Sequence, residues 1–492
     1  MTEPLRVLIL AAEVVPFAKT GHLAEVVGSL PQALKKLGVD VRVAMPRYGR
    51  VDPDRFGLET VLEPFDVPMD QHHEPVSVLR ATIGDSATFG DNVPVYFVDN
   101  ARYLGREGIY GYPDDGERFV LFCRGALEML KHLDWTPDVI HCHDWHTAII
   151  PQWLKTLYRD DPFFAPTATV YTIHNLAYQG IFGTRILEIA GIDEYHFQVP
   201  QIRDLDNVVD LMAQGILFAD AVSTVSQTYA QEILTPEYGE KLDLLLRDRR
   251  DRLFGILNGI DTEVQNPATD PHIVSHFDME HLEDRGENKL DLQRVARFEP
   301  DPDIPLMGAI SRLTDQKGFD LIAQILDAVV HLNLQFVVLG TGEQRYHELL
   351  SDVARRHPQR LSVFLTFNAE LAQKIYAGTD MFLMPSRFEP CGLGQMIAMR
   401  YGSVPIVRRT GGLADTVQDF DPCADTGNGF VFARYNALDL FAAIVRAVET
   451  FKYPAVWRRL QLRGMAEDYS WDASARQYVE LYHKAQSFKA EE

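Results

Sequence analysis

A chain of 492 residues is longer than a single hydrophobic core usually supports, so its length indicates two large domains. The hydrophobic fraction of 46% and the charged fraction of 24% are those of an ordinary soluble globular protein. A formal net charge of -23 argues against nucleic acid and anionic membrane surfaces as partners. It does not exclude an anionic ligand, because local Arg and Lys side chains can dominate the field inside a cleft.

The beginning of the chain and the cysteines give an expected compartment. The apolar stretch Val7–Leu10 is short, is followed by Glu13 and lacks a cleavage-site pattern, which indicates a first β-strand rather than a signal peptide. No apolar run is long enough to span a bilayer. The 4 cysteines form no Cys-x-x-Cys pair and no scaffold-like spacing, which favours a reducing environment. We therefore expect a cytoplasmic protein.

Short β-branched runs alternate with helical patterns along the chain. This alternation predicts an α/β fold of β-α-β units, with parallel sheets that are buried on both faces. Strands are expected at Val7–Leu10, Val41–Ala44, Val95–Val98, Val139–His141, Thr169–Thr172, Ala221–Thr224, Leu306–Ile310, Gln335–Leu339, Leu361–Thr366, Met381–Met384 and Val404–Val407.

The domain boundaries follow from turn signals. A turn at Asn258–Asp261 precedes a polar, Pro-containing stretch, so the first domain is expected to span 1–260 and the second 261–470. Residues 471–492 are predicted to form a C-terminal helix, free to pack back on the first domain. The segment 52–91 has weak helical periodicity and is interpreted as an insertion of loops and extra strands.

Two loops of the chain carry nearly the same sequence. Residues 19–27, here called loop A, read KTGHLAEVV, and residues 409–417, here called loop B, read RTGGLADTV. Glycine loops between a strand and a helix expose backbone N–H groups that can face an anion. Glu389 lies in a similar loop, after the predicted strand Met381–Met384. Two halves with related loops suggest a clamshell around a phosphorylated ligand.

Two cations, Arg312 and Lys317, follow the predicted strand Leu306–Ile310. At the C-terminal edge of a parallel sheet they would be able to neutralise a diphosphate leaving group. A solvated basic loop explains them equally well. The sequence leaves both interpretations open.

The run His141-Cys142-His143-Asp144-Trp145-His146 invites a metal interpretation. Side chains alternate between faces along a strand, and no second group with ligand spacing follows, so we expect no metal here. The histidines are interpreted as packed or hydrogen-bonded, with Asp144 facing a cleft. His174, after the next strand, is either a structural histidine or a sugar contact, and the residues alone slightly favour the former.

Weaker patterns accompany these. Gly340-Thr341-Gly342 resembles a truncated dinucleotide fingerprint but has no suitable acidic partner. Phe367 is either a core residue or a surface on which a base stacks. The loops with Lys19, Asp144, His174, Arg312, Glu389 and Gly411 all follow predicted strands, and parallel sheets bring such strand ends to one edge.

An ordered series of phrases makes the chain resemble the family of bacterial glycogen synthases and plant starch synthases. The resemblance runs from Val7 to about Trp471. The phrases are K-T-G-x-L at Lys19, H-D-W-H at His143, H-N-L-A-Y-Q-G at His174, L-N-G-I-D at Leu257, S-R-L-T-x-Q-K-G at Ser311 and S-R-F-E-P-C-G-L at Ser386.

The resemblance implies a GT-B architecture, two Rossmann-like domains with the active site in the cleft between them. It implies a retaining glycosyltransferase that moves glucose from ADP-glucose to the non-reducing end of an α-1,4-glucan. It implies neither a metal ion nor a cofactor, and it leaves the preference over UDP-glucose, the primer length and the oligomeric state open.

The resemblance also assigns roles to residues. Arg312 and Lys317 would stabilise the diphosphate, Glu389 would lie beside the donor glucose, and the carbonyl of His174 would stabilise positive charge on the sugar. Asp144 and Asn258 would line the sugar site. The other donor-binding residues would be Lys19, Gly21, Phe367, Leu393, Gly394, Gly411 and Gly412.

Four positions depart from the family pattern, and one of them, Gln265 in place of a usual tryptophan, is interpreted as a packing difference. His22 stands where a second glycine is usual and Glu25 where an aspartate is usual, so His22 could crowd the donor. Gly394 replaces a residue with a hydroxyl or amide, which would remove one hydrogen bond to the donor.

Two alternatives to an active synthase follow. One is a catalytically weakened paralogue that binds or primes glucan. The other is a glucan phosphorylase, for which the chain is short and lacks the motif around a pyridoxal phosphate lysine.

Overall fold

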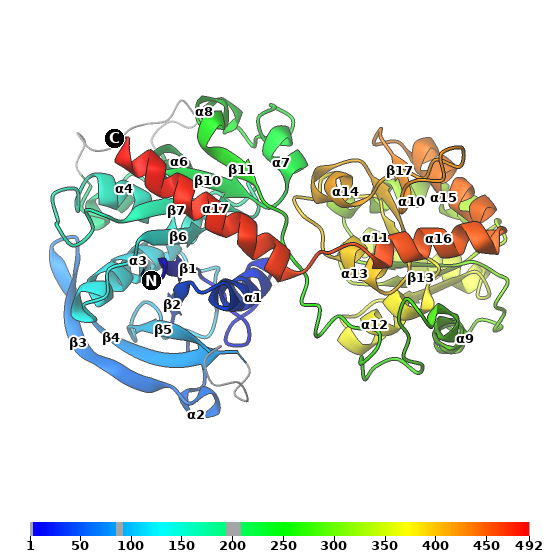
Figure 1. Ribbon diagram of the computed structural model, residues 1–492, viewed down its shortest axis with the longest axis horizontal. Coiled ribbons are helices and arrows are strands. Elements are labelled where there is room, and N and C mark those ends of the chain that lie inside the picture. The colour runs from blue at the N-terminus through cyan, green and yellow to red at the C-terminus, as the bar shows by residue number, and fades with distance from the viewer. Residues whose placement is uncertain (1–2, 85–91, 193–207, 492) are drawn as a thin grey trace. The chain divides into compact units, whose positions relative to one another are not determined.

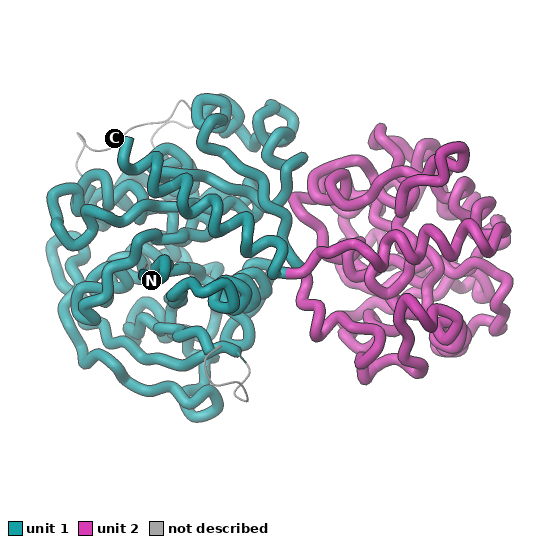
Figure 2. The backbone as a smooth tube through the Cα atoms, in the orientation of Figure 1, with its two compact units in different colours: residues 1–259, 471–492 teal, residues 260–470 magenta. Residues whose placement is uncertain are grey.

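The computed structural model describes residues 3–84, 92–192 and 208–491 and divides into two compact units (Figure 2). Unit 1 comprises residues 1–259 and 471–492, and unit 2 comprises residues 260–470. Each unit has a sheet flanked by helices (Figure 1). This confirms the predicted α/β class, with two Rossmann-like domains.

Unit 1 contains a 9-stranded sheet in the order β11-β10-β7-β6-β1-β2-β5-β4-β3. The seven strands from β11 to β5 are parallel, and β4 and β3 continue the sheet as antiparallel strands. The strands are β1 Arg6–Leu10, β2 Asp40–Pro46, β3 Glu59–Met69, β4 His72–Ile83, β5 Val93–Asp99, β6 Val139–His143, β7 Ala168–Ile173, β10 Ala221–Thr224 and β11 Leu253–Gly255, with a separate pair β8 Ile181–Gly183 and β9 Val208–Asp210.

Helices cover this sheet. They are α1 His22–Lys36, α2 Pro53–Phe56, α3 Asp115–His132, α4 Ile149–Lys155, α5 Arg185–Ile189, α6 Leu211–Phe218, α7 Gln227–Glu232, α8 Asp243–Asp248 and α17 Trp471–Ala490. The C-terminal α17 lies beside α1 in Figure 1, and its Trp471, Tyr478 and Tyr482 belong to the same apolar core as Val7 and Leu34. The last helix of the chain is therefore part of unit 1.

Unit 2 contains a 6-stranded parallel sheet in the order β14-β13-β12-β15-β16-β17. Its strands are β12 Leu306–Ile310, β13 Gln335–Leu339, β14 Leu361–Phe364, β15 Met381–Met384, β16 Val404–Arg408 and β17 Phe430–Phe432. Its helices are α9 Arg285–Val295, α10 Phe319–Val329, α11 Gln344–Arg356, α12 Ala369–Gly378, α13 Gly394–Arg400, α14 Gly411–Thr416, α15 Ala437–Phe451 and α16 Pro454–Met465.

The strand order of unit 2 is the 3-2-1-4-5-6 order of dinucleotide-binding folds. The direction of winding reverses between β12 and β15, and ligands of such sheets bind outside the strand ends at this point. In unit 1 the corresponding reversal lies between β1 and β6. The loops that follow these four strands are therefore the first place to look for a site.

The predicted strands are confirmed within two residues at each end. The insertion at 52–91 contains the hairpin of β3 and β4, as expected, although residues 85–91 lie outside the described part. The short edge strands β11 and β17 were not predicted. Three residues are too few to show a period, so only pairing with a neighbouring strand reveals them.

Candidate functional site

Two loops of unit 2 meet at the reversal point between β12 and β15. The loop after β12 ends in a short 3-10 turn, Asp315–Lys317, and the loop after β15 contains Glu389. The backbone N–H of Arg387 donates to the carbonyl of Gln316 at 2.8 Å. The Nζ of Lys317 consequently lies 2.6 Å from Oε2 of Glu389. Opposite charges from two strand ends form one ion pair.

The Lys317–Glu389 pair is buried. The side chains of Lys317 and Glu389 are 14% and 5% exposed, and the hydroxyl of Ser386 donates to the same carboxylate oxygen at 2.9 Å. A buried pair recovers little of what its desolvation costs, so it is weak evidence for a stabilising role. Its place at the strand ends, where ligands of such sheets bind, makes it the candidate site of unit 2.

Loop B packs against the backbone of the segment that contains Glu389. The N–H of Gly412 approaches the carbonyl oxygens of Glu389 and Pro390 at 3.2 Å each. A Cβ on Gly411 would lie 2.0 Å from the carbonyl oxygen of Glu389, and Gly411 has a φ of 43°. A Cβ on Gly412 would lie 1.9 Å from the carbonyl oxygen of Cys391. Both glycines are thus required for the close approach of the two loops.

The other predicted residues of unit 2 surround this pair less closely. Arg312 is exposed, and among the residues that the structure describes its guanidinium donates only to Gln316 Oε1, at 3.5 Å. Phe367 is 90% exposed, which rules out the interpretation as a core residue. Leu393 is the N-cap of α13, where Gly394 begins the helix.

Gly394, where the family usually has a residue with a hydroxyl or amide, lies against the interior of unit 2. A Cβ there would lie 3.2 Å from Met384 Sδ and 3.2 Å from Phe382 Cε1. A side chain at this position would first meet the interior of unit 2. The idea that it would bond the donor stays a prediction.

In unit 1, loop A is anchored by a buried carboxylate. Glu13, 3% exposed, follows β1 and accepts hydrogen bonds from Gly21 N at 3.0 Å, Thr20 Oγ1 at 2.7 Å, Thr20 N and Tyr110 OH at 2.6 Å. Glu13 was missed in the sequence. The available signal was a carboxylate inside an apolar run directly after a strand, where burial requires a partner for it.

Lys19 itself is exposed and forms an ion pair with Glu25, with Nζ and Oε1 2.5 Å apart. A Cβ on Gly21 would meet nothing within 4 Å, and His22 is exposed as the first residue of α1. Position 21 of loop A therefore has room for a side chain. The structure gives no steric reason within unit 1 against a histidine at position 22.

Asp144 and His174 follow the neighbouring strands β6 and β7. The N–H of His174 donates to Asp144 Oδ1 at 2.8 Å. Burial raises the pKa of Asp144 to about 7, although bonds from the His174 and Asn175 N–H groups act in the opposite direction. Burial and the nearby His22 lower the pKa of His174 to about 3, so its ring is neutral at ordinary pH. The side chain of Asp144 and the backbone of His174 thus meet where the neighbouring strands β6 and β7 end.

The histidines of β6 are hydrogen-bonded, as the sequence suggested. His141 contacts Tyr482 OH at 2.9 Å and Thr172 Oγ1 at 2.6 Å, and His143 contacts His174. The expectation that strand alternation separates the histidines is wrong for His141 and His143, because residues two apart share a face and their ring centroids lie 4.1 Å apart. Within the described ranges no group of three or more potential ligands could hold a metal ion.

Asn258 occupies the loop after β11 and is 4% exposed. Its Oδ1 is buried and accepts no hydrogen bond from the residues that the structure describes. Buried acceptors of this kind are rare unless a water or ligand satisfies them. This observation supports its assignment to a ligand site.

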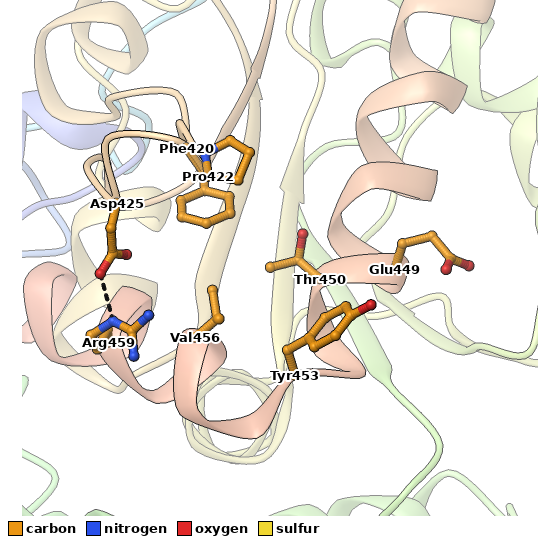
Figure 3. A pocket seen from close by; sticks show the side chains of 8 residues that line it. All are labelled: Phe420, Pro422, Asp425, Glu449, Thr450, Tyr453, Val456 and Arg459. Carbon is orange, nitrogen blue, oxygen red and sulfur yellow. Dashed lines mark hydrogen bonds and ion pairs between the residues drawn. The ribbon is translucent and has the colours of Figure 1, made fainter.

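A separate surface pocket of unit 2 lies away from these loops (Figure 3). Phe420, Tyr453 and Thr450 line it together with the ion pair of Asp425 and Arg459, whose atoms are 2.8 Å apart. Its walls come from the segment after α14 and from α15 and α16. None of the predicted site residues lines this pocket, so it is not the candidate site.

Two family models match the chain. The model described as starch synthase catalytic domain matches residues 6–248, and the model described as glycosyl transferases group 1 matches residues 304–450.

Across the described residues, no helix is both long and apolar enough to cross a membrane.

Whole-chain comparisons agree with these models. A glycogen synthase of Moorella thermoacetica is 49% identical over 486 residues, covering 99% of this chain and 98% of that protein. A glycogen synthase of Desulforudis audaxviator is 46% identical over 499 residues, with coverage of 99% and 98%. The catalytic domain of starch synthase IV from Arabidopsis thaliana, bound to ADP and acarbose, is 35% identical with a TM-score of 0.88, covering 98% of this chain and 100% of that one.

Proposed function

The chain belongs to the glycogen and starch synthase family of glycosyltransferases, and we propose that it transfers glucose from ADP-glucose to the non-reducing end of an α-1,4-glucan with retention of configuration. The observation that carries this proposal is the buried Lys317–Glu389 pair at the winding reversal of unit 2. The ADP and acarbose bound to the related starch synthase support this choice of donor and acceptor.

The proposed chemistry follows from charge. Cleavage of the bond between glucose and diphosphate separates a positive, oxocarbenium-like sugar from a negative leaving group. Arg312 and Lys317 lower the barrier by stabilising the diphosphate, since preorganised cations act most strongly where charge develops. Glu389 lies beside the donor glucose and holds Lys317 in position until the phosphates arrive.

Unit 1 supplies polar groups for the sugar. The carbonyl oxygen of His174 stabilises the positive ring, and Asp144 and Asn258 bind sugar hydroxyls. The neutral ring of His174 suits this role, because an imidazolium would repel the developing positive charge. Lys19 and Gly21 of loop A contact the donor.

The remaining donor contacts lie in unit 2. Phe367, 90% exposed, provides a face on which adenine stacks. Leu393 and Gly394 at the start of α13, with Gly411 and Gly412 of loop B, present backbone groups to the phosphates. A cytoplasmic location completes the proposal, supported by the four cysteines, which are all free thiols.

Incorporation of labelled glucose from ADP-glucose into glycogen tests the proposal. An active synthase incorporates label steadily, and unlabelled ADP-glucose competes better than unlabelled UDP-glucose. Glycogen binding without incorporation would favour the alternative, a weakened paralogue, for which the histidine at position 22 is the motivating observation. Lys19, Arg312, Lys317 and Glu389 are all present and argue against that alternative.

A further inference from the structure

A pair of stacked histidines connects the core of unit 1 to the proposed sugar site. His143 ends β6 and is 0% exposed, whereas His174 after β7 is partly exposed. The Nδ1 of His143 lies 2.8 Å from Nε2 of His174, and the ring centroids are 5.1 Å apart at an interplanar angle of 26°. A distance of 2.8 Å between two ring nitrogens requires one proton between them.

The position of that proton follows from the other nitrogen of His143. Burial holds the pKa of His143 and of His174 below the usual range, so each neutral ring carries one N–H. The Nε2 of His143 is buried and has no hydrogen-bond partner among the described residues. If His174 donated, the proton of His143 would be on this Nε2, as a buried donor without an acceptor. Orphaned buried N–H groups are rarer than under-used acceptors.

We propose that His143 is a positioning residue, whose Nδ1–H donates to Nε2 of His174 and thereby fixes the proton of His174 on Nδ1. The Nδ1 of His174 makes no hydrogen bond within the described ranges. The ring of His174 therefore offers one N–H, in a fixed orientation, to an oxygen of the bound sugar or its phosphate. This role rests on the proposed function.

His141 keeps His143 in place. Both ring nitrogens of His141 are used, by Tyr482 OH of α17 and by Thr172 Oγ1, and the latter is 2.6 Å from Ser223 Oγ. The ring of His141 lies 4.1 Å from that of His143. Because His143 is 0% exposed and its ring packs on that of His141, the donor direction of His143 is set by the core rather than by the ligand.

The tautomer can be read directly from the unmodified protein. In protein labelled with ¹⁵N-histidine, the ring signals of His174 are assigned by their loss in His174→Gln. We expect Nδ1 to be protonated and Nε2 to be bare. A protonated Nε2 on His174 would overturn the proposal. This measurement requires neither activity nor a stable His143 variant.

Kinetics of His143 variants provide the second test. His143→Asn retains an N–H near the position of Nδ1, whereas His143→Leu removes it. We expect His143→Leu to lower kcat about 100-fold, at nearly unchanged KM for the donor, because misorientation acts on the transition state. His143→Asn should recover about tenfold of that loss.

His146 provides the matched control. It belongs to the same motif and is 7% exposed, but it packs against Tyr110, Phe119 and Trp145. His146→Leu should leave kcat within about threefold of the unmodified protein. Equal kcat losses in His143→Leu, His143→Asn and His146→Leu would contradict the proposal. A lack of glucosyl transfer by the unmodified protein would instead contradict the proposed function, and the tautomer would still be measurable.

Discussion

Loops A and B have nearly the same sequence, but different groups hold each of them in place. In unit 2, loop B rests on backbone: Gly412 N approaches the carbonyl oxygen of Glu389 at 3.2 Å. In unit 1, loop A rests on a side chain, because Gly21 N donates to the carboxylate of Glu13 at 3.0 Å. A backbone support leaves no space for a Cβ, whereas a carboxylate holds the loop at a distance. The sequence can therefore vary at His22 but not at Gly412.

The charges near the two loops differ as well. Beside loop B, Lys317 and Glu389 form a buried ion pair. In unit 1, the buried carboxyl of Asp144 has a pKa of about 7, and the ring of His174 beside it is neutral. Under the proposed function, the cation of unit 2 would bind the diphosphate, and the uncharged groups of unit 1 would bind the hydroxyls of the sugar.

Removal of a cation from unit 2 should have a large effect. Arg312→Ala is expected to lower kcat about 100-fold to 1000-fold, because a cation that stabilises the leaving diphosphate is lost. Steady-state incorporation of labelled glucose measures kcat. The control is Arg459→Ala in the separate pocket, expected within about threefold. Equal rates for the two variants would show that Arg312 is only a solvated surface residue.

Glycine-to-alanine substitutions in loops A and B should differ in their effect on stability. Gly412→Ala is expected to destabilise unit 2 by about 3 kcal/mol and to displace Glu389, since the Cβ would overlap the carbonyl oxygen of Cys391. Gly21→Ala should cost less than about 1 kcal/mol. Thermal unfolding of both variants checks this difference. If they unfold alike, the distinction between the two supports is wrong.

The carboxyl of unit 1 should produce a pH dependence. The pKa of Asp144 in the folded protein, about 7, lies above its unfolded value. The folded state thus keeps a proton that the unfolded chain releases, which adds stability at low pH that is lost as pH rises through about 7. Relative to Asp144→Asn, the unmodified protein should be about 1–3 kcal/mol more stable at about pH 5 than at about pH 8. Parallel stability curves for the two proteins would contradict the raised pKa.

The smallest effect is expected at His22. If the ring crowds the donor, His22→Gly should raise donor affinity and turnover by about twofold, the size typical of exposed positions. Isothermal titration with ADP-glucose and initial rates measure the two quantities. If neither quantity rises, the crowding hypothesis is wrong. The exposed position of His22 would then explain why its ring leaves the donor undisturbed.

Much of this arrangement could be predicted from the sequence. Apolar runs predict the parallel strands, and the loops after those strands indicate Asp144, His174, Lys317 and Glu389 as candidate site residues. Contacts between distant segments could not be predicted. The anchoring by Glu13 depends on the folding of loop A around it, and the pairing of His143 with His174 depends on strand register. These contacts form only when the sheet places β1, β6 and β7 side by side.

The turnover of Lys317→Ala, measured with labelled ADP-glucose and saturating glycogen, tests the central claim most directly. We predict a rate about 100-fold to 1000-fold below that of the unmodified protein, with thermal unfolding still cooperative. A folded variant that incorporates glucose at nearly the unmodified rate would contradict the assignment of the leaving-group site to the Lys317–Glu389 pair.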